Sequence, residues 1–146
     1  MPAPYAGIAC FIDEDPASDA VRDEAVALPA QSPGELHLVH VASTPWPLYS
    51  DLYGGVGFPY EEVRAAAREW IDRQAAGTPG AGPTLPEGWA PGAACGFLRR
   101  NDIDLVVAAA HRGRAERALL GGFASYLAYH APCPVLLVHP APAGGG

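Results

Sequence analysis

Three short apolar runs constrain the fold of this chain more than any other feature. They lie within residues 6–12, 104–110 and 135–139, and in each the apolar residues follow one another instead of alternating with polar ones. Strands of this kind are buried on both faces, which is typical of a parallel sheet with helices on either side. A further strand is predicted at 36–42, which contains Val-His-Val.

Helical patterns separate these strands. Asp15 and Pro16 predict a helix start, because aspartate is a favoured N-cap and proline suits the first helical position. The apolar residues that recur in this first helix are Ala20, Val21, Ala25 and Leu28. A second helix begins after Pro59, and its apolar stripe consists of Val63, Ala66, Ala67, Trp70 and Ile71. Shorter helices are predicted at 93–100 and 121–130, the second with three larger side chains on one side: Phe123, Leu127 and His130.

The order of strands and helices predicts the fold class. Strand, helix, strand units imply parallel pairing, so we expect an α/β fold, a single doubly wound, Rossmann-like domain with a five-stranded parallel sheet. The remaining strand is placed at 83–87, between segments rich in glycine and proline. Residues 44–59 are predicted to form a long surface loop. The domain is expected to span 1–140, and 141–146 to be a flexible tail.

Composition excludes several classes of function. The chain contains no lysine, so neither a Walker-type phosphate loop nor Schiff-base catalysis is possible. A net charge of −7 argues against nucleic acid or an anionic membrane as partner. Cys10, Cys95 and Cys133 form no Cys-x-x-Cys pair, which favours reduced, mostly buried thiols over a disulfide framework or a metal site. With no signal-peptide pattern and no apolar run of about 18 residues, the expected location is the cytoplasm.

Two segments carry candidate ligand chemistry, because ligands of open α/β sheets bind beyond the carboxyl ends of the strands. Asp13 ends the first strand and either accepts a hydrogen bond from a ligand or stays solvated, whereas Asp15 is expected to cap the helix.

The second segment follows the strand at 104–110. In His111-Arg112-Gly113-Arg114, the arginines can pair with phosphate oxygens and the glycine frees the backbone. Gly121-Gly122 precedes a helix whose N-terminal amides favour an anion. The alternative is a solvated basic turn with glycines that serve only tight packing.

The same segments resemble the universal stress protein family. The matching pieces are Asp104-Leu105-Val106-Val107, His111-Arg112-Gly113-Arg114, Leu119-Leu120-Gly121 and, most specific, the run from His130 to Val138. A strand ending in Asp13, a helix and Leu36 to Val41 agree as well. The resemblance implies a parallel sheet in the order 3-2-1-4-5 and frequent dimerisation.

The resemblance also implies a nucleotide site. Asp13 matches an adenosine-facing aspartate, Val41 an apolar neighbour of adenine, and Gly113 and Gly121 the second and third glycines of a phosphate motif. Ala110, or Ala109 with a different gap, replaces the first glycine, and seven residues separate Gly113 from Gly121. Gly122 stands where the family has a serine or threonine hydroxyl. These departures remove contacts that a buried phosphate needs.

Two functions follow from this pattern. The first is a small regulatory or stress-response protein that binds ATP or AMP, with Mg²⁺ if ATP, through Asp13, Val41, Ala110, Arg112, Gly113, Arg114, Gly121 and Gly122. The alternative is a dimeric stress-related interaction protein that binds no nucleotide. Neither is an enzyme, although weak ATP hydrolysis stays open. A homodimer is expected through the edge strand Val135–Val138, unless the proline-rich tail covers that edge.

Overall fold

β1, Gly7–Phe11, is the centre of the fold, and all five of its residues are buried. It pairs in parallel with β2, Glu35–Val39, on one side and with β6, Leu105–Ala109, on the other. The computed structural model describes residues 5–14, 16–28, 35–43, 60–78, 80–88, 90–110 and 121–139. Within them, the apolar runs at 6–12 and 104–110 therefore form inner strands, as their sequences predict.

Two outer strands complete the sheet. β4, Ala81–Thr84, pairs with β2, and β7, Val135–Val138, pairs with β6. The order β4-β2-β1-β6-β7 is parallel throughout and equals 3-2-1-4-5 when these five strands are numbered in chain order. The predicted doubly wound α/β fold is confirmed.

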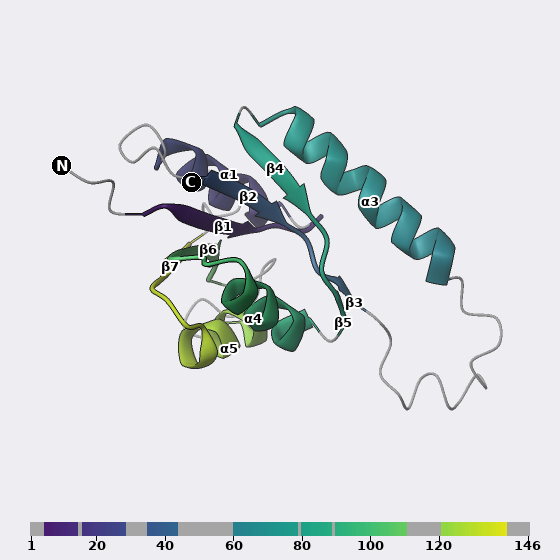
Figure 1. Ribbon diagram of the computed structural model, residues 1–146. Helices are drawn as coiled ribbons and strands as arrows, with labels where there is room; N and C mark the ends of the chain where they lie inside the picture. Colours follow the sequence, from purple (N-terminus) through teal and green to yellow (C-terminus); the bar gives the residue numbers. More distant parts are fainter. Residues whose placement is uncertain are drawn as a thin grey trace, which may run out of the picture.

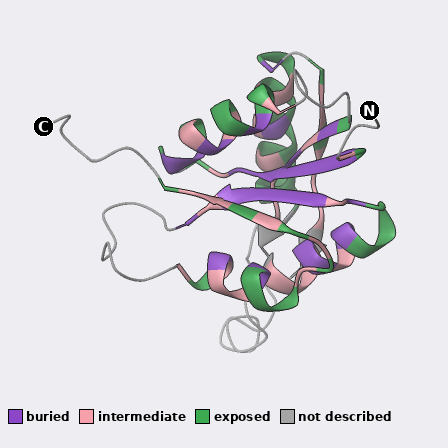
Figure 2. Ribbon diagram, turned by 90° about the vertical axis from the view of Figure 1, so that its left-hand side faces the viewer, coloured by how far each residue is buried: buried purple, intermediate pink, exposed green. Residues whose placement is uncertain are grey.

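Helices cover both faces of this sheet (Figure 1). α1, Ala17–Ala27, and α3, Tyr60–Ala76, pack on one face, while α4, Ala90–Arg100, and α5, Gly122–His130, pack on the other. Alternate residues of β1 contribute to the two cores: Ile8 and Cys10 to one, Ala9 and Phe11 to the other. Burial is concentrated in the central strands and in the helix surfaces turned toward them (Figure 2). No helix in the described ranges is long and apolar enough to cross a bilayer.

The strand predicted at 83–87 is corrected to two shorter ones. β4 ends at Thr84, and a separate β5, Glu87–Gly88, pairs with β3, Ala42–Ser43. Pro83 lacks an N–H group but lies in an edge strand, where proline is tolerated. The predicted strand at 36–42 is likewise divided, because His40 and Val41 separate β2 from β3.

Two predicted apolar faces are only partly correct. In α3, Ile71 is fully buried, but Val63 is 42% exposed and Ala66 is exposed. The first half of α3 extends past the ends of the strands, so no sheet lies beneath those residues (Figure 1). In α5, Leu127 is buried as expected, whereas His130 is exposed and its ring lies 4.3 Å from that of Tyr126.

Asp104 joins the amino ends of β1 and β6. Its two carboxylate oxygens accept hydrogen bonds from the backbone N–H groups of Ala6, at 2.9 Å, and Gly7, at 3.0 Å. Its own N–H donates to the carbonyl of Gly7 at 2.9 Å. A Cβ at Gly7 would lie 3.1 Å from the backbone oxygen of Asp102, a tight contact that glycine avoids. One carboxylate therefore links the amino ends of these two strands, beside the backbone hydrogen bonds.

We predict that Asp104→Ala lowers the free energy of unfolding by about 1.5–3 kcal/mol, because two backbone donors lose a charged acceptor. Urea unfolding measures the change. Asp72→Ala is the matched control, since Asp72 is exposed on α3 and should change stability by less than about 0.5 kcal/mol. If the two variants lost equal amounts of unfolding free energy, the stabilising role assigned to the Asp104 carboxylate would be contradicted.

Because the Cys10 thiol is buried, we predict that the free energy of unfolding falls at alkaline pH. Burial raises its pKa from 9.0 to about 12, and the Arg22 guanidinium lowers it only in part. Between those values the unfolded chain releases the thiol proton and the folded chain keeps it. The free energy of unfolding should therefore fall as pH rises above 9.0, by about 1.4 kcal/mol per pH unit from this group.

Urea unfolding of the protein and of Cys10→Ala, at about pH 8 and about pH 10.5, tests this expectation. The variant should be less stable at the lower pH through lost packing, but it should lose about 2 kcal/mol less on going to the higher pH. The same alkaline loss in both proteins would show that Cys10 is not responsible.

Candidate functional site

The strand order reverses between β1 and β6, and this reversal marks the expected ligand edge. β4 and β2 lie on one side of β1, whereas β6 and β7 lie on the other. Ligands of open α/β sheets bind at such a point, beyond the carboxyl ends of the strands. Asp13, Val41 and Ala110 follow β1, β2 and β6, so the structure brings these three predicted residues to one edge.

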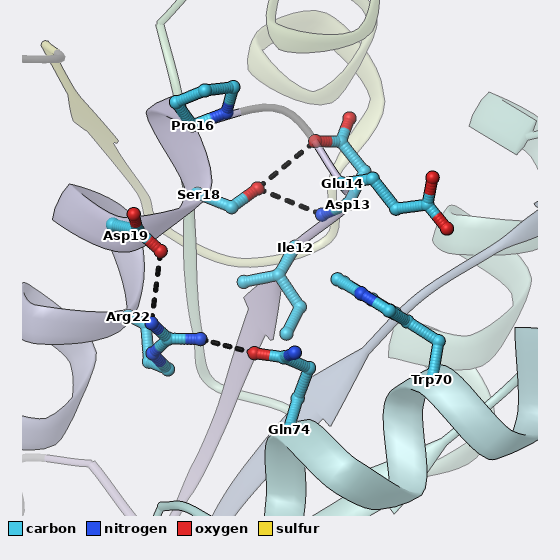
Figure 3. Close-up of a pocket in the computed structure, with 9 residues that line it drawn as sticks. All are labelled: Ile12, Asp13, Glu14, Pro16, Ser18, Asp19, Arg22, Trp70 and Gln74. Carbon is cyan, nitrogen blue, oxygen red and sulfur yellow. Dashed lines mark hydrogen bonds and ion pairs between the residues drawn. The ribbon is translucent and has the colours of Figure 1, made fainter.

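A reciprocal pair of hydrogen bonds holds Asp13 at the exit of β1. The Asp13 N–H donates to Ser18 Oγ at 2.8 Å, and the Ser18 hydroxyl donates back to Asp13 Oδ1 at 3.1 Å (Figure 3). Ser18 is buried in the first turn of α1, while Asp13 keeps part of its surface exposed. The Asp13 carboxylate is therefore oriented by the protein, not merely solvated.

The sequence pattern does not assign a role to Ser18. A small polar residue on the inner side of a first helical turn is nevertheless a usable signal for a hydrogen bond to the preceding strand end. The predicted cap, Asp15, lies outside the described residues. Pro16, the residue before α1, has helical dihedral angles, and its carbonyl accepts from the Asp19 N–H at 3.1 Å.

His40 and Val41 face opposite sides of the sheet. His40 Nδ1 lies 3.1 Å from the carbonyl oxygen of Ile12, and its ring is 4.9 Å from that of Trp70 on α3. Val41 instead packs against the core beneath α4 and α5. The two neighbouring residues thus lie on opposite faces of the sheet, and the adenosine contacts expected of Asp13 and Val41 stay predictions.

A pocket of about 240 Å³ opens between α1 and α3 beside Asp13. Ile12 and the Trp70 ring supply its apolar surface, and Arg22 reaches it from α1 (Figure 3). Arg22 donates to Gln74 Oε1 and forms an ion pair with Asp19 at 3.0 Å. The sequence assigned Trp70 only to a buried stripe, because the pairing of two distant helices cannot be read from either one.

The two ends of the predicted phosphate loop meet at the carboxyl end of β6. The Gly121 N–H donates to the Ala110 carbonyl at 2.9 Å, and the Ala110 N–H donates to that of Val138 at 2.8 Å. Ala110 is fully buried. Gly121 directly precedes α5, so the amino end of that helix lies beside the end of β6. Arg112, Gly113 and Arg114 fall within 111–120, outside the described residues.

Gly122 is the first residue of α5 and is exposed. Among the described residues, a Cβ built there would meet no atom within 4 Å, so these residues leave room for a serine side chain.

The family model for universal stress proteins matches residues 4–139. The chain belongs to the universal stress protein family. This membership agrees with the strand order of the sheet and with the sequence resemblance in the N-terminal and C-terminal thirds of the chain. None of the curated proteins matches the chain.

Solved universal stress proteins share the architecture. UspA from Lactobacillus plantarum is 20% identical, with a TM-score of 0.73 over 93% of this chain and 99% of that one. A universal stress protein in complex with cAMP is 20% identical, with a TM-score of 0.63 over 94% and 99%. A family protein from Arabidopsis thaliana with AMP bound is 14% identical, with a TM-score of 0.61 over 96% and 97%. At these identities the likeness establishes the fold.

Proposed function

We propose that this universal stress protein binds an adenine nucleotide, AMP or ATP, at the carboxyl edge of its sheet and acts as a small regulatory or stress-response protein in the cytoplasm. One observation carries the proposal: the anchored Asp13 carboxylate follows β1, and the amino end of α5 lies beside the end of β6, the strand adjacent to β1. Similar proteins have been solved with AMP and with cAMP, which supports the same ligand class here.

Each part of the edge has a chemical role in this proposal. The exposed part of the Asp13 carboxylate accepts from a hydroxyl or amine of the nucleoside. The N-terminal amides of α5 attract a phosphate, and Arg112 and Arg114 carry the charges that pair with its oxygens. Among the described residues, no group of three or more His, Cys, Asp or Glu side chains could hold a metal ion. In this proposal Mg²⁺ accompanies the phosphates where ATP is the ligand.

Titration calorimetry with AMP tests the site, with Asp13→Ala and Gly122→Ser as paired variants. Asp13→Ala should weaken binding, because the oriented acceptor is lost. Gly122→Ser should tighten it by up to about 1.5–3 kcal/mol, or about 10- to 150-fold, since a hydroxyl is added at a position with room for it.

Gly122→Ala is the matched control for Gly122→Ser, because it adds the Cβ without the hydroxyl. Absence of measurable AMP or ATP binding by the protein and by Gly122→Ser would contradict the proposal.

A second candidate function, a dimeric interaction protein without nucleotide, is favoured by the outer edge of β7. Among the described strands, β7 pairs only with β6, so its other edge offers unpaired backbone groups. Leu136 on this strand is 38% exposed. A second copy of the chain could pair with this edge across a two-fold axis. We propose such a homodimer whether or not nucleotide binds.

Leu136→Lys should shift the protein to a monomer, because it places a charge beside the edge without entering either core. Light scattering over a dilution series measures the mass. Leu137→Lys is the contrasting variant, since Leu137 packs against the core beneath α4 and α5 and its replacement should also reduce stability. A monomer mass for the unmodified protein at every concentration would contradict the homodimer.

A further inference from the structure

The pocket between α1 and α3 lies on the sheet face opposite α4 and α5, and the proposed nucleotide function assigns no ligand to it (Figure 1). Its volume is about 240 Å³, below the roughly 300–1,000 Å³ of sites for drug-sized ligands. Figure 3 shows the Trp70 side chain directed from α3 toward Ile12, so one wall of the pocket is an indole. The cavity therefore suits a small molecule with an apolar part.

The indole of Trp70 is held in place by its neighbours. It packs against the core beside Ile71 and stays partly exposed. The His40 ring contacts it at a centroid distance of 4.9 Å and an interplanar angle of 58°, and His40 Nδ1 lies 3.1 Å from the carbonyl oxygen of Ile12. An aromatic ring fixed in this way loses little freedom when a ligand packs on it.

The polar lining of the pocket carries a net negative charge. Asp13, Glu14 and Asp19 contribute three carboxylates, and Arg22 contributes one guanidinium. That guanidinium is already engaged, because it forms an ion pair with Asp19 at 3.0 Å and donates a hydrogen bond to Gln74 Oε1. The sign of the charge in the rest of the lining therefore favours a cation.

An aromatic wall inside a negatively charged cavity is the chemistry that recognises an organic cation. Tryptophan attracts a cation over its ring more strongly than any other aromatic side chain, and alkyl groups on the cation add apolar contact. An anion would instead be repelled by the carboxylates. A bare metal ion fits less well, because in the described ranges no group of three or more His, Cys, Asp or Glu could hold one.

We propose that this pocket binds a small alkylammonium ion, with its charge beside Glu14 and its alkyl groups against Trp70 and Ile12. The site is separate from the proposed nucleotide function and does not depend on it. Trp70 is then a binding residue contributed by α3, and Glu14 is a binding residue contributed by the segment that follows β1.

A single-tryptophan protein tests the site directly. Trp46→Phe and Trp89→Phe together leave Trp70 as the only indole in the chain. Choline chloride should change its emission in a saturable manner, with a midpoint in the millimolar range because few atoms make contact. Sodium chloride at the same ionic strength is the control for screening and should give no saturable change.

A neutral molecule of the same shape separates charge from apolar contact. In 3,3-dimethylbutan-1-ol a carbon atom replaces the charged nitrogen of choline, so it should bind Trp70 much more weakly than choline does. If the two molecules changed the emission with equal midpoints, the pocket would be merely apolar and the proposal would be wrong. If choline gave no saturable change, the pocket would not be a cation site.

Glu14→Gln tests the carboxylate in the same single-tryptophan protein. It should raise the choline midpoint by about 2- to 5-fold, the range of an exposed ion pair. Glu24→Gln on α1 is the matched control, since Glu24 is also exposed but does not line the pocket, and it should leave the midpoint unchanged. Equal midpoints for the two variants would overturn the placement of the charge beside Glu14.

Discussion

Burial of β1 on both faces and both edges is the constraint on which the rest of the structure depends. The strand donates and accepts backbone hydrogen bonds with β2 and β6, so its polar groups are satisfied without water. Its side chains alternate between the two cores, with Cys10 on one side and Phe11 on the other. Helices must therefore cover both faces, and the chain must cross from one side of β1 to the other. That crossing creates the edge where the proposed ligand binds.

The exit of β1 links this core to the proposed site. The ladder continues one residue past the strand, where the Ile12 N–H donates to the Val39 carbonyl at 2.9 Å. The Ile12 carbonyl then holds His40, and the next residue, Asp13, is held by Ser18. Backbone and side-chain hydrogen bonds thus orient the groups at the proposed site. An oriented carboxylate needs little rearrangement when a ligand binds.

The two faces of the sheet differ in how they depart from the family pattern. At the phosphate end, Gly122 lacks a hydroxyl and Ala110 is buried at the position of a motif glycine. On the face of α1 and α3, the pocket beside Trp70 adds an aromatic surface that the resemblance did not include.

The sequence by itself determined the two central strands β1 and β6, because short unbroken apolar runs between helical patterns are typical of strands buried on both faces of a parallel sheet. It also placed Asp13 and the 110–122 segment at one edge, since all parallel strands end on the same side. It could not determine the length of the third strand, where Pro83 and Pro86 limit pairing that depends on the neighbouring strand. Nor could it show that Val63 is exposed and Trp70 lines a pocket, because both lie on the same helical stripe. Only the tertiary structure decides how far a helix overlaps its sheet and which helix stands opposite, since those depend on contacts between segments distant in the chain.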